Sequence, residues 1–266
     1  MDLGLYDKAA IVFGGADGIG AAIVQALHAE GAGVAVADLN KERADSLAKN
    51  MGPLVVPISC DVSSKDQIVA AVELAAKQFG GLQILVLSVG LTLPDRLEDI
   101  TDTDIEKTFA VNMRSHVWAA QAALPKMREA GYGRIVLIGS GSGIKGSGGL
   151  MLYSASKFFL RGLTQAMGIE LGPTGVTVNI VCPSDVYPEG ERPAGSWANE
   201  KLVNVSCRKE NALDLDGVRE ARIARTPLQR SCSTQDIANV VAFLCSSQAN
   251  FITAQTIAVN GGLLPT

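Results

Sequence analysis

The chain has 266 residues, 47% of them hydrophobic, so it is long enough to bury a large core. Its net charge of −4 leaves no general basic surface, which excludes nucleic acid and anionic membranes as expected partners. The longest apolar run, LQILVLSVGL, is too short to span a bilayer, and we expect no secretory signal at the N-terminus.

Short β-branched runs alternate with helical patterns along the chain. The predicted strands are residues 9–13, 33–37, 54–58, 83–87, 134–138, 176–181 and 255–259. The predicted helices are residues 18–30, 40–50, 64–79, 101–129, 153–171 and 233–246. This alternation predicts a parallel sheet with helices on both faces, and strands that are apolar at consecutive positions are typical of such sheets. We therefore expect one doubly wound α/β domain over residues 1–266, with a seven-stranded parallel sheet.

Residues 184–225 interrupt the alternation. The segment contains Pro188, Pro193, Gly195 and an isolated Trp197, together with charges of both signs. A long insertion in a compact domain is usually either functional or disordered. We expect a lid over a site, with a flexible surface loop as the alternative, and the second half of the segment has a helical pattern.

A glycine-rich turn, GGADGIG, joins the first predicted strand to the first predicted helix. In such a unit the missing side chains let backbone N–H groups and the helix N-terminus approach a pyrophosphate. The spacing differs from the strict G-x-G-x-x-G pattern, so a tight turn without a ligand is the alternative. We expect dinucleotide contacts from Gly14, Asp17, Gly18, Ile19 and Gly20.

The second predicted strand leads into Asp38, roughly 20 residues beyond the turn, where an acidic residue can bond the adenosine ribose hydroxyls. A carboxylate there repels a 2′-phosphate, and Asp17 adds negative charge, so the sequence favours NAD over NADP. Leu39 is expected in the same contact region. The alternative for Asp38 is a helix N-cap, which is compatible with ligand binding.

Tyr153 and Lys157 lie four residues apart in YSASK, so a helix would place both on one face. A free phenol has a pKa of ~10, and a nearby cation typically lowers such a pKa by ~1–3 units. We interpret the pair as an activated phenol for proton transfer. A surface Tyr–Lys pair without a function is the alternative.

Together these motifs resemble the short-chain dehydrogenase/reductase family, a Rossmann-type fold, over nearly the whole chain. The resemblance also depends on Asp61 in CDVSS, Asn112 in FAVNM, and Ser140 ahead of Tyr153. It implies that Tyr153 is the general acid/base and that Lys157 holds the nicotinamide ribose and lowers the tyrosine pKa. It further implies that Ser140 orients the substrate oxygen, that Asn112 holds a water in a proton relay, and that Asp61 contacts adenine. The remaining cofactor contacts expected from it are Val62, Ser88, Gly90, Pro183 and Val186.

The implied activity is that of an NAD-dependent alcohol dehydrogenase or ketoreductase, which transfers a hydride between NAD(H) and a secondary alcohol or ketone. The sequence shows no arginine cluster for a charged substrate, and apolar residues border the expected site. We therefore expect a medium-sized, largely apolar substrate, cyclic or steroid-like. The residues behind this expectation are Leu91, Leu93, Leu150, Met151 and Trp197.

The alternative function is a non-catalytic dinucleotide-binding sensor or structural subunit on the same fold. Departures from the family pattern support it. They are Phe13 in place of a threonine, Leu87 and Ser88 at the end of a strand, and Ser184 and Pro188 beyond the sixth strand.

The family resemblance and the cysteine content give expectations for the quaternary structure and the cellular location. The resemblance implies a homo-oligomer, a tetramer or dimer, with helices 101–129 and 153–171 at an interface. Five scattered cysteines without a CxxC pair predict reduced thiols in a cytoplasmic protein and no metal site. His116 is interpreted as a structural histidine, with contact to a partner subunit as the alternative.

Overall fold

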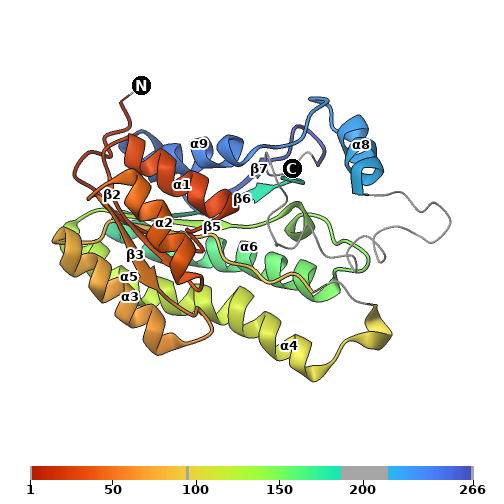
Figure 1. Cartoon of the computed structure of the whole chain (residues 1–266), viewed down its shortest axis with the longest axis horizontal. Helices are drawn as coiled ribbons and strands as arrows, with labels where there is room; N and C mark the ends of the chain where they lie inside the picture. The colour runs from red at the N-terminus through yellow and green to blue at the C-terminus, as the bar shows by residue number, and fades with distance from the viewer. Residues whose placement is uncertain (1, 94–95, 187–214, 265–266) are drawn as a thin grey trace.

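A computed structural model describes residues 2–93, 96–186 and 215–264 (Figure 1). Seven strands form one sheet in the order β3-β2-β1-β4-β5-β6-β7, and every neighbouring pair is parallel. The strands are β1 (Ala9–Phe13), β2 (Gly33–Asp38), β3 (Val55–Ser59), β4 (Ile84–Leu87), β5 (Gly133–Ile138), β6 (Val176–Pro183) and β7 (Thr256–Val259). The predicted seven-stranded parallel sheet is confirmed, with strand ends that differ from the expected ones by one or two residues.

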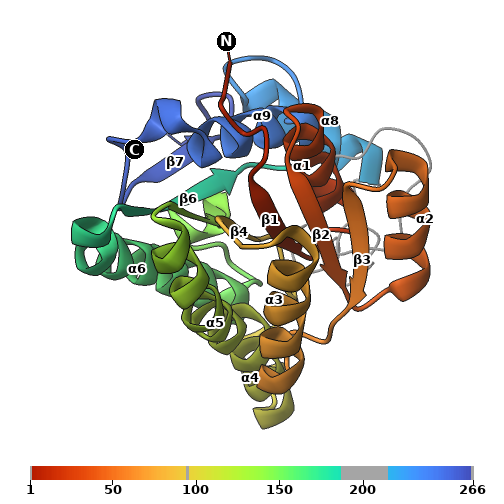
Figure 2. The same cartoon turned by 90° about the vertical axis from the view of Figure 1, so that its left-hand side faces the viewer.

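Helices cover both faces of the sheet, as Figure 2 shows. One face carries α1 (Gly18–Ala29), α2 (Lys41–Met51) and α9 (Thr234–Cys245). The other carries α3 (Lys65–Phe79), α5 (Ser115–Ala130) and α6 (Met151–Leu171). The two layers of helices give the doubly wound arrangement that the sequence predicted.

Two apolar cores explain why the strands are hydrophobic at consecutive positions. Successive strand side chains point to opposite faces, so Val12 and Val86 join the core beneath α1 and α9. Their neighbours Ile11 and Leu85 join the core beneath α3 and α5. All four are fully buried, which fixes the strand register from both sides.

The predicted helix 101–129 is interrupted in the structure. It consists of α4 (Asp102–Phe109), a π-helical turn (Ala110–Arg114) and α5. Thr101 and Asp104 start α4 with a reciprocal capping box. The π turn inserts extra backbone into the helix, and it contains the fully buried Asn112.

The predicted lid falls largely outside the described residues, including Pro188, Pro193, Gly195 and Trp197. The helical pattern at its end is confirmed as α8 (Leu215–Arg225). In the described ranges, none of the helices combines the length and the apolar character that crossing a bilayer requires.

The strand order reverses between β1 and β4, since β2 and β3 lie on one side of β1 and β4 to β7 on the other. In an open parallel sheet, ligands bind beyond the carboxyl ends of the strands at such a switch point. The loops that follow β1, β4, β5 and β6 all leave the sheet at this edge.

Candidate active site

A cavity of about 730 Å³ lies at the carboxyl edge of the sheet, at the switch point. Its lining includes most of the residues that the sequence singled out: Asp17, Gly18, Ile19, Gly20, Ser88, Gly90, Ser140, Tyr153, Lys157, Pro183 and Val186. Six others are not among the lining residues: Gly14, Asp38, Leu39, Asp61, Val62 and Asn112. The fold thus brings residues from four loops together around one space.

The glycine turn brings the backbone close to the first turn of α1. Gly14 has a φ of +72°, and its N–H donates to Ala37 O at 2.8 Å. A Cβ atom on Gly20 would lie 1.9 Å from Gly14 O, so only glycine fits there. Backbone bonds therefore hold the turn in place, although Phe13 has replaced the threonine hydroxyl that is typical of the family.

Asp38 lies at the end of β2, beside this turn. Its Oδ2 accepts from Ala16 N at 3.0 Å, and its Oδ1 accepts from Asn40 N at 2.9 Å. Asn40 is the N-cap of α2, so the alternative interpretation of Asp38 as the helix cap is wrong. Asp38 instead ties the glycine turn to the start of α2.

Asp17 caps α1, accepting from Gly18 N at 2.7 Å, and its other carboxylate oxygen pairs with Arg43. Arg43 is the basic side chain near Asp38 that could otherwise meet a 2′-phosphate. The ion pair with Asp17 offsets the positive charge of Arg43.

Asp61 follows β3, where Cys60 N donates to Asp38 O at 2.9 Å. This bond places Asp61 next to the end of β2, and its Oδ1 accepts from Ser63 N at 2.8 Å. Val62 is half-buried, whereas Leu39 is 73% exposed. Adenine contacts by these residues stay a prediction.

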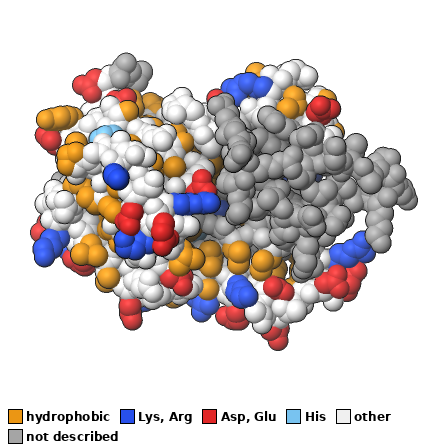
Figure 3. Space-filling model, viewed as in Figure 1, with side chains coloured by type: hydrophobic (Ala, Val, Ile, Leu, Met, Phe, Trp, Pro, Cys, Tyr) orange, Lys and Arg blue, Asp and Glu red, His pale blue; other side chains and the backbone are white. Residues whose placement is uncertain are grey.

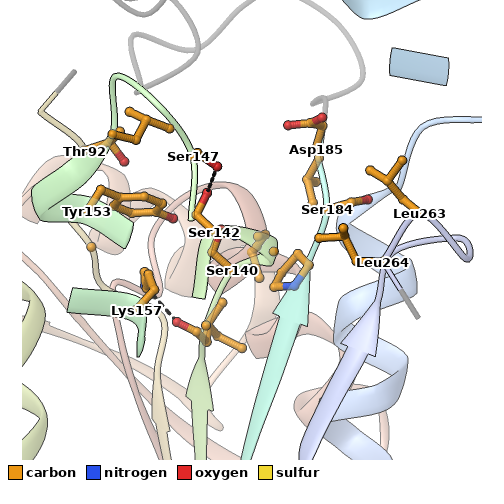
Figure 4. Close-up of a pocket in the computed structure, with 18 of the residues that line it drawn as sticks. Thr92, Ser140, Ser142, Ser147, Tyr153, Lys157, Ser184, Asp185, Leu263 and Leu264 are labelled. Atoms are coloured by element: carbon orange, nitrogen blue, oxygen red, sulfur yellow. Dashed lines mark hydrogen bonds between the residues drawn. The ribbon is translucent and has the colours of Figure 1, made fainter. Parts of the chain in front are cut away.

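Ser140 and Tyr153 face each other across the inner part of the cavity (Figure 4). Ser140 follows β5 and caps the short 3₁₀ turn Gly141–Gly143, and its Oγ accepts from Ser142 N at 3.1 Å. Tyr153 lies in the first turn of α6, which begins two residues before the predicted start. A substrate oxygen can therefore lie between two hydroxyl groups held by separate elements.

Burial raises the pKa of the Tyr153 phenol above its ordinary value, while hydrogen bonding with Ser140 and with Thr92 opposes the rise. The charge of Lys157 is not among these causes, so its expected lowering of the tyrosine pKa stays a prediction. The Lys157 Nζ lies 5.6 Å from the centroid of the tyrosine ring and donates to Ile138 O at 2.9 Å. The phenol is thus held in its protonated form at neutral pH.

Lys157 is 3% exposed, and burial lowers the pKa of its ammonium group to about 8. Gly90 permits its position, because a Cβ on Gly90 would lie 3.2 Å from the Lys157 Nζ. Because Gly90 has no side chain, the Lys157 amine can lie close to the backbone at this point of the cavity wall.

The buried lysine predicts a specific dependence of stability on pH. The unfolded chain holds this proton up to about pH 10.5, whereas the folded chain releases it near pH 8. Between these values the unfolded state binds more protons, so this group makes the folded state more stable as pH rises, by up to about 3 kcal/mol in total. The difference in unfolding free energy between wild type and Lys157→Met, measured from pH 7 to 10, should show this slope. Replacing the exposed Lys49 in the same way should leave the slope unchanged, and a flat difference for Lys157→Met would contradict the buried charge.

Asn112 fastens the loop after β4 to α6. Its Oδ1 accepts from Leu91 N at 2.6 Å, and its Nδ2 donates to Leu91 O at 2.8 Å and to Ser156 Oγ at 3.0 Å. Ser156 Oγ in turn donates to Tyr153 O at 2.7 Å. The side chain thus positions the catalytic helix, and the expected role in holding a water stays a prediction.

His116 lies one turn after Asn112 and is fully buried. Burial, together with the charge of Lys157, lowers the pKa of His116 to about 3, so the imidazole is neutral. Its Nδ1 lies 3.0 Å from Ser115 Oγ. The structural interpretation of His116 fits this placement better than a surface contact with a partner.

Sequence reasoning missed several polar residues of the cavity wall. Thr92 and Ser147 line the side near Tyr153, and Asp185 lies on the opposite side (Figure 4). Arg222, which also lines the cavity, bonds Asp185. Further cations at the cavity are Lys145 and Arg225. Of the described apolar residues that we expected around the substrate, Leu91, Leu93 and Met151 are not among the lining residues, whereas Leu150 is. The lining thus mixes polar and charged groups with apolar ones, two arginines included, and the size and nature of the substrate stay a prediction.

On the described part of the face that Figure 3 shows, charged side chains of one sign do not gather into a patch. In Figure 3 acidic and basic side chains are interspersed over the described part of the visible face. Such a face offers no broad basic area to a polyanion.

Known proteins share both the sequence and the fold of this chain. The profile of the short chain dehydrogenase family matches residues 8–199, and that of the enoyl-(acyl carrier protein) reductases matches residues 206–264. A 4-formylbenzenesulfonate dehydrogenase of Comamonas testosteroni is 35% identical over 98% of this chain and 99% of its own length. An L-2,3-butanediol dehydrogenase of Corynebacterium glutamicum is 33% identical, with coverage of 97% and 98%.

Two crystal structures extend the comparison to the fold. A short-chain dehydrogenase/reductase from Brucella melitensis superposes with a TM-score of 0.85 at 29% identity and covers all of both chains. A metagenomic blue fluorescent protein in complex with NADPH superposes with a TM-score of 0.82 at 32% identity, and the match covers 98% of this chain and 99% of that one. This chain belongs to the short-chain dehydrogenase family of oxidoreductases.

Proposed function

We propose that the protein oxidises a secondary alcohol to a ketone with NAD as the hydride acceptor, or catalyses the reverse reduction. The observation that carries the proposal is the convergence of Ser140, Tyr153 and Lys157 on one cavity that also contains the glycine turn. The relatives named for butanediol and for 4-formylbenzenesulfonate support dehydrogenase chemistry, and their different substrates leave the substrate class open.

The residues present fit a dinucleotide. The missing side chain at Gly20 lets the turn pack closely on the start of α1, and the first residues of that helix line the cavity, where their backbone N–H groups can face a pyrophosphate. Asp38 would accept hydrogen bonds from the adenosine ribose, and Lys157 would donate to the nicotinamide ribose. When bound, the nicotinamide accepts or gives the hydride.

The chain itself handles the proton. In ketone reduction the Tyr153 hydroxyl donates its proton to the substrate oxygen, while Ser140 donates a hydrogen bond to that oxygen and orients it. In alcohol oxidation Tyr153 takes the hydroxyl proton from the substrate. Because burial raises the pKa of Tyr153, the phenol is suited to act as an acid at neutral pH, and oxidation should require more alkaline conditions.

The preference for NAD depends on Asp38. A 2′-phosphate would lie against a carboxylate already bonded to Ala16 N and Asn40 N, and like charges in contact disfavour binding. Asp38→Ser should therefore raise kcat/KM with NADP relative to NAD by about 10- to 100-fold.

Initial rates with both cofactors and a panel of secondary alcohols and ketones test the function and this preference together. If wild type turns over no member of the panel with either cofactor, the proposed activity is refuted. If it turns over substrates equally well with NADP, only the cofactor assignment fails.

A further inference from the structure

Asp185 places a carboxylate on the substrate side of the cavity. It follows directly after β6 and Ser184, and it lies across the cavity from Tyr153 and Thr92 (Figure 4). Its side chain is 31% exposed, so it is partly removed from solvent. A carboxylate in this position is within the same cavity as the tyrosine hydroxyl.

One carboxylate oxygen of Asp185 has a partner in the described part of the chain, and the other has none there. Arg222 of α8 donates from Nη1 to Asp185 Oδ1 at 2.7 Å. Among the described residues no donor reaches Oδ2. The ion pair holds the carboxylate in place without using its full capacity to accept hydrogen bonds. Burial raises the pKa of Asp185, and the charges of Arg222 and Arg225 oppose the rise.

The neighbouring walls also present hydroxyl groups. Thr92, Ser142, Ser147 and Ser184 all line the cavity, and Ser142 Oγ lies 3.0 Å from Ser147 Oγ. Ser142 and Ser147 are partners of each other, and Thr92 bonds Tyr153, so Asp185 Oδ2 is the acceptor on this wall that a substrate hydroxyl can use. Burying polar groups without hydrogen bonds is costly, and sites built to bond a hydroxyl discriminate strongly against analogues that lack it.

We propose that Asp185 Oδ2 accepts a hydrogen bond from a second hydroxyl group of the substrate, which assigns the substrate to the diols and their hydroxyketones. This inference rests on the proposed function, since it concerns the same cavity. An anionic substrate, attracted by the exposed Arg225 and Lys145, is the competing class, but its charge would face the Asp185 carboxylate.

Matched pairs of alcohols test the assignment. Wild type should oxidise 2,3-butanediol better than sec-butanol, and the vicinal cyclohexanediols better than cyclohexanol. We expect the ratio of kcat/KM values, diol over mono-alcohol, to reach about 10 to 100, as for a hydrogen bond to a charged acceptor. Asp185→Asn and Asp185→Ala should lower this ratio about tenfold or more, with most of the loss on the diol.

The ratio separates recognition from structure. If Asp185 served only to hold α8 through Arg222, its replacement would slow both members of a pair equally and leave the ratio unchanged. Glu30→Gln is the matched control, because Glu30 follows the last residue of α1, at the opposite end of the helix from the cavity. It should leave the ratio as in wild type.

The possible results distinguish a failure of the Asp185 assignment from a failure of the proposed function. If wild type oxidises the mono-alcohols as well as the diols, or prefers hydroxy acids in a manner insensitive to Asp185→Asn, the assignment of Asp185 is overturned while the dehydrogenase activity stands. If no alcohol is oxidised, the proposed function itself fails. A wild-type ratio near 1 overturns the proposal even if both variants fold poorly.

Discussion

Tyr153→Phe should lower kcat by about 100- to 10,000-fold, in both directions of the reaction, because it removes the only proton donor placed against the substrate oxygen by our account. Dinucleotide affinity should stay close to that of wild type, since phenylalanine keeps the aromatic ring and its packing and loses only the hydroxyl group. Steady-state rates and titration of NADH fluorescence measure the two quantities separately.

Tyr132→Phe is the matched control. Tyr132 also has a phenol, and its hydroxyl donates to Cys245 O at 2.7 Å, away from the cavity lining. Its loss should cost about 1 kcal/mol of stability and leave kcat unchanged. If Tyr153→Phe retained wild-type turnover, another group would have to move the proton, and the proposed role of Tyr153 would be wrong.

Gly20→Ala should abolish dinucleotide binding and destabilise the fold by roughly 3 kcal/mol or more, because overpacking against backbone cannot be relieved by a rotamer change. The added Cβ would lie 1.9 Å from Gly14 O. The turn would have to open, and with it the approach of the backbone to the pyrophosphate. Thermal unfolding and NADH titration report the two effects.

Gly18→Ala tests whether close contact is the cause. Gly18 lies in the same turn with a φ of +53°, but a Cβ there meets no atom within 4 Å. The expected cost is the backbone strain alone, about 1 kcal/mol, with weaker effects on binding. Equal damage from both variants would contradict the argument from contact.

Strand and helix periodicity predicted most of the fold because each strand is buried on both faces and each helix is amphipathic. The adjacent apolar residues Ile11 and Val12 illustrate the burial on both faces, because neighbouring strand side chains point to opposite faces and each needs a core of its own. The π turn around Asn112 could not be predicted, because one extra residue in a helical turn leaves the overall apolar pattern intact. The start of α6 at Met151 was missed for a similar reason, since Leu150 provides no side-chain cap.

The placement of Ser140, Tyr153 and Lys157 at one cavity was predictable because these residues are fixed by local spacing and by strand ends, and their catalytic roles stay predictions. The polar wall around Asp185 was not, since Thr92, Asp185 and Arg222 come from three distant segments and form no motif. A signal did exist: a charged residue two positions after the strand that ends at Pro183 must emerge at the carboxyl edge of the sheet.

The tyrosine shows where spacing alone misleads. Residues four apart on a helix share a face, but the Lys157 ammonium bonds Ile138 O, and burial dominates the pKa of the phenol. Activation of the phenol by Lys157 therefore stays a prediction.

The most direct test follows the hydride itself. Wild type is mixed with NAD⁺ and a diol that has deuterium on its carbinol carbons, and the nicotinamide product is examined by mass spectrometry and NMR. We expect one deuterium at C4 of the nicotinamide and a hydroxyketone as the oxidised product. Deuterium lost to water, or bound NAD⁺ with no reduced nicotinamide formed from any alcohol in the panel, would contradict direct hydride transfer at this site.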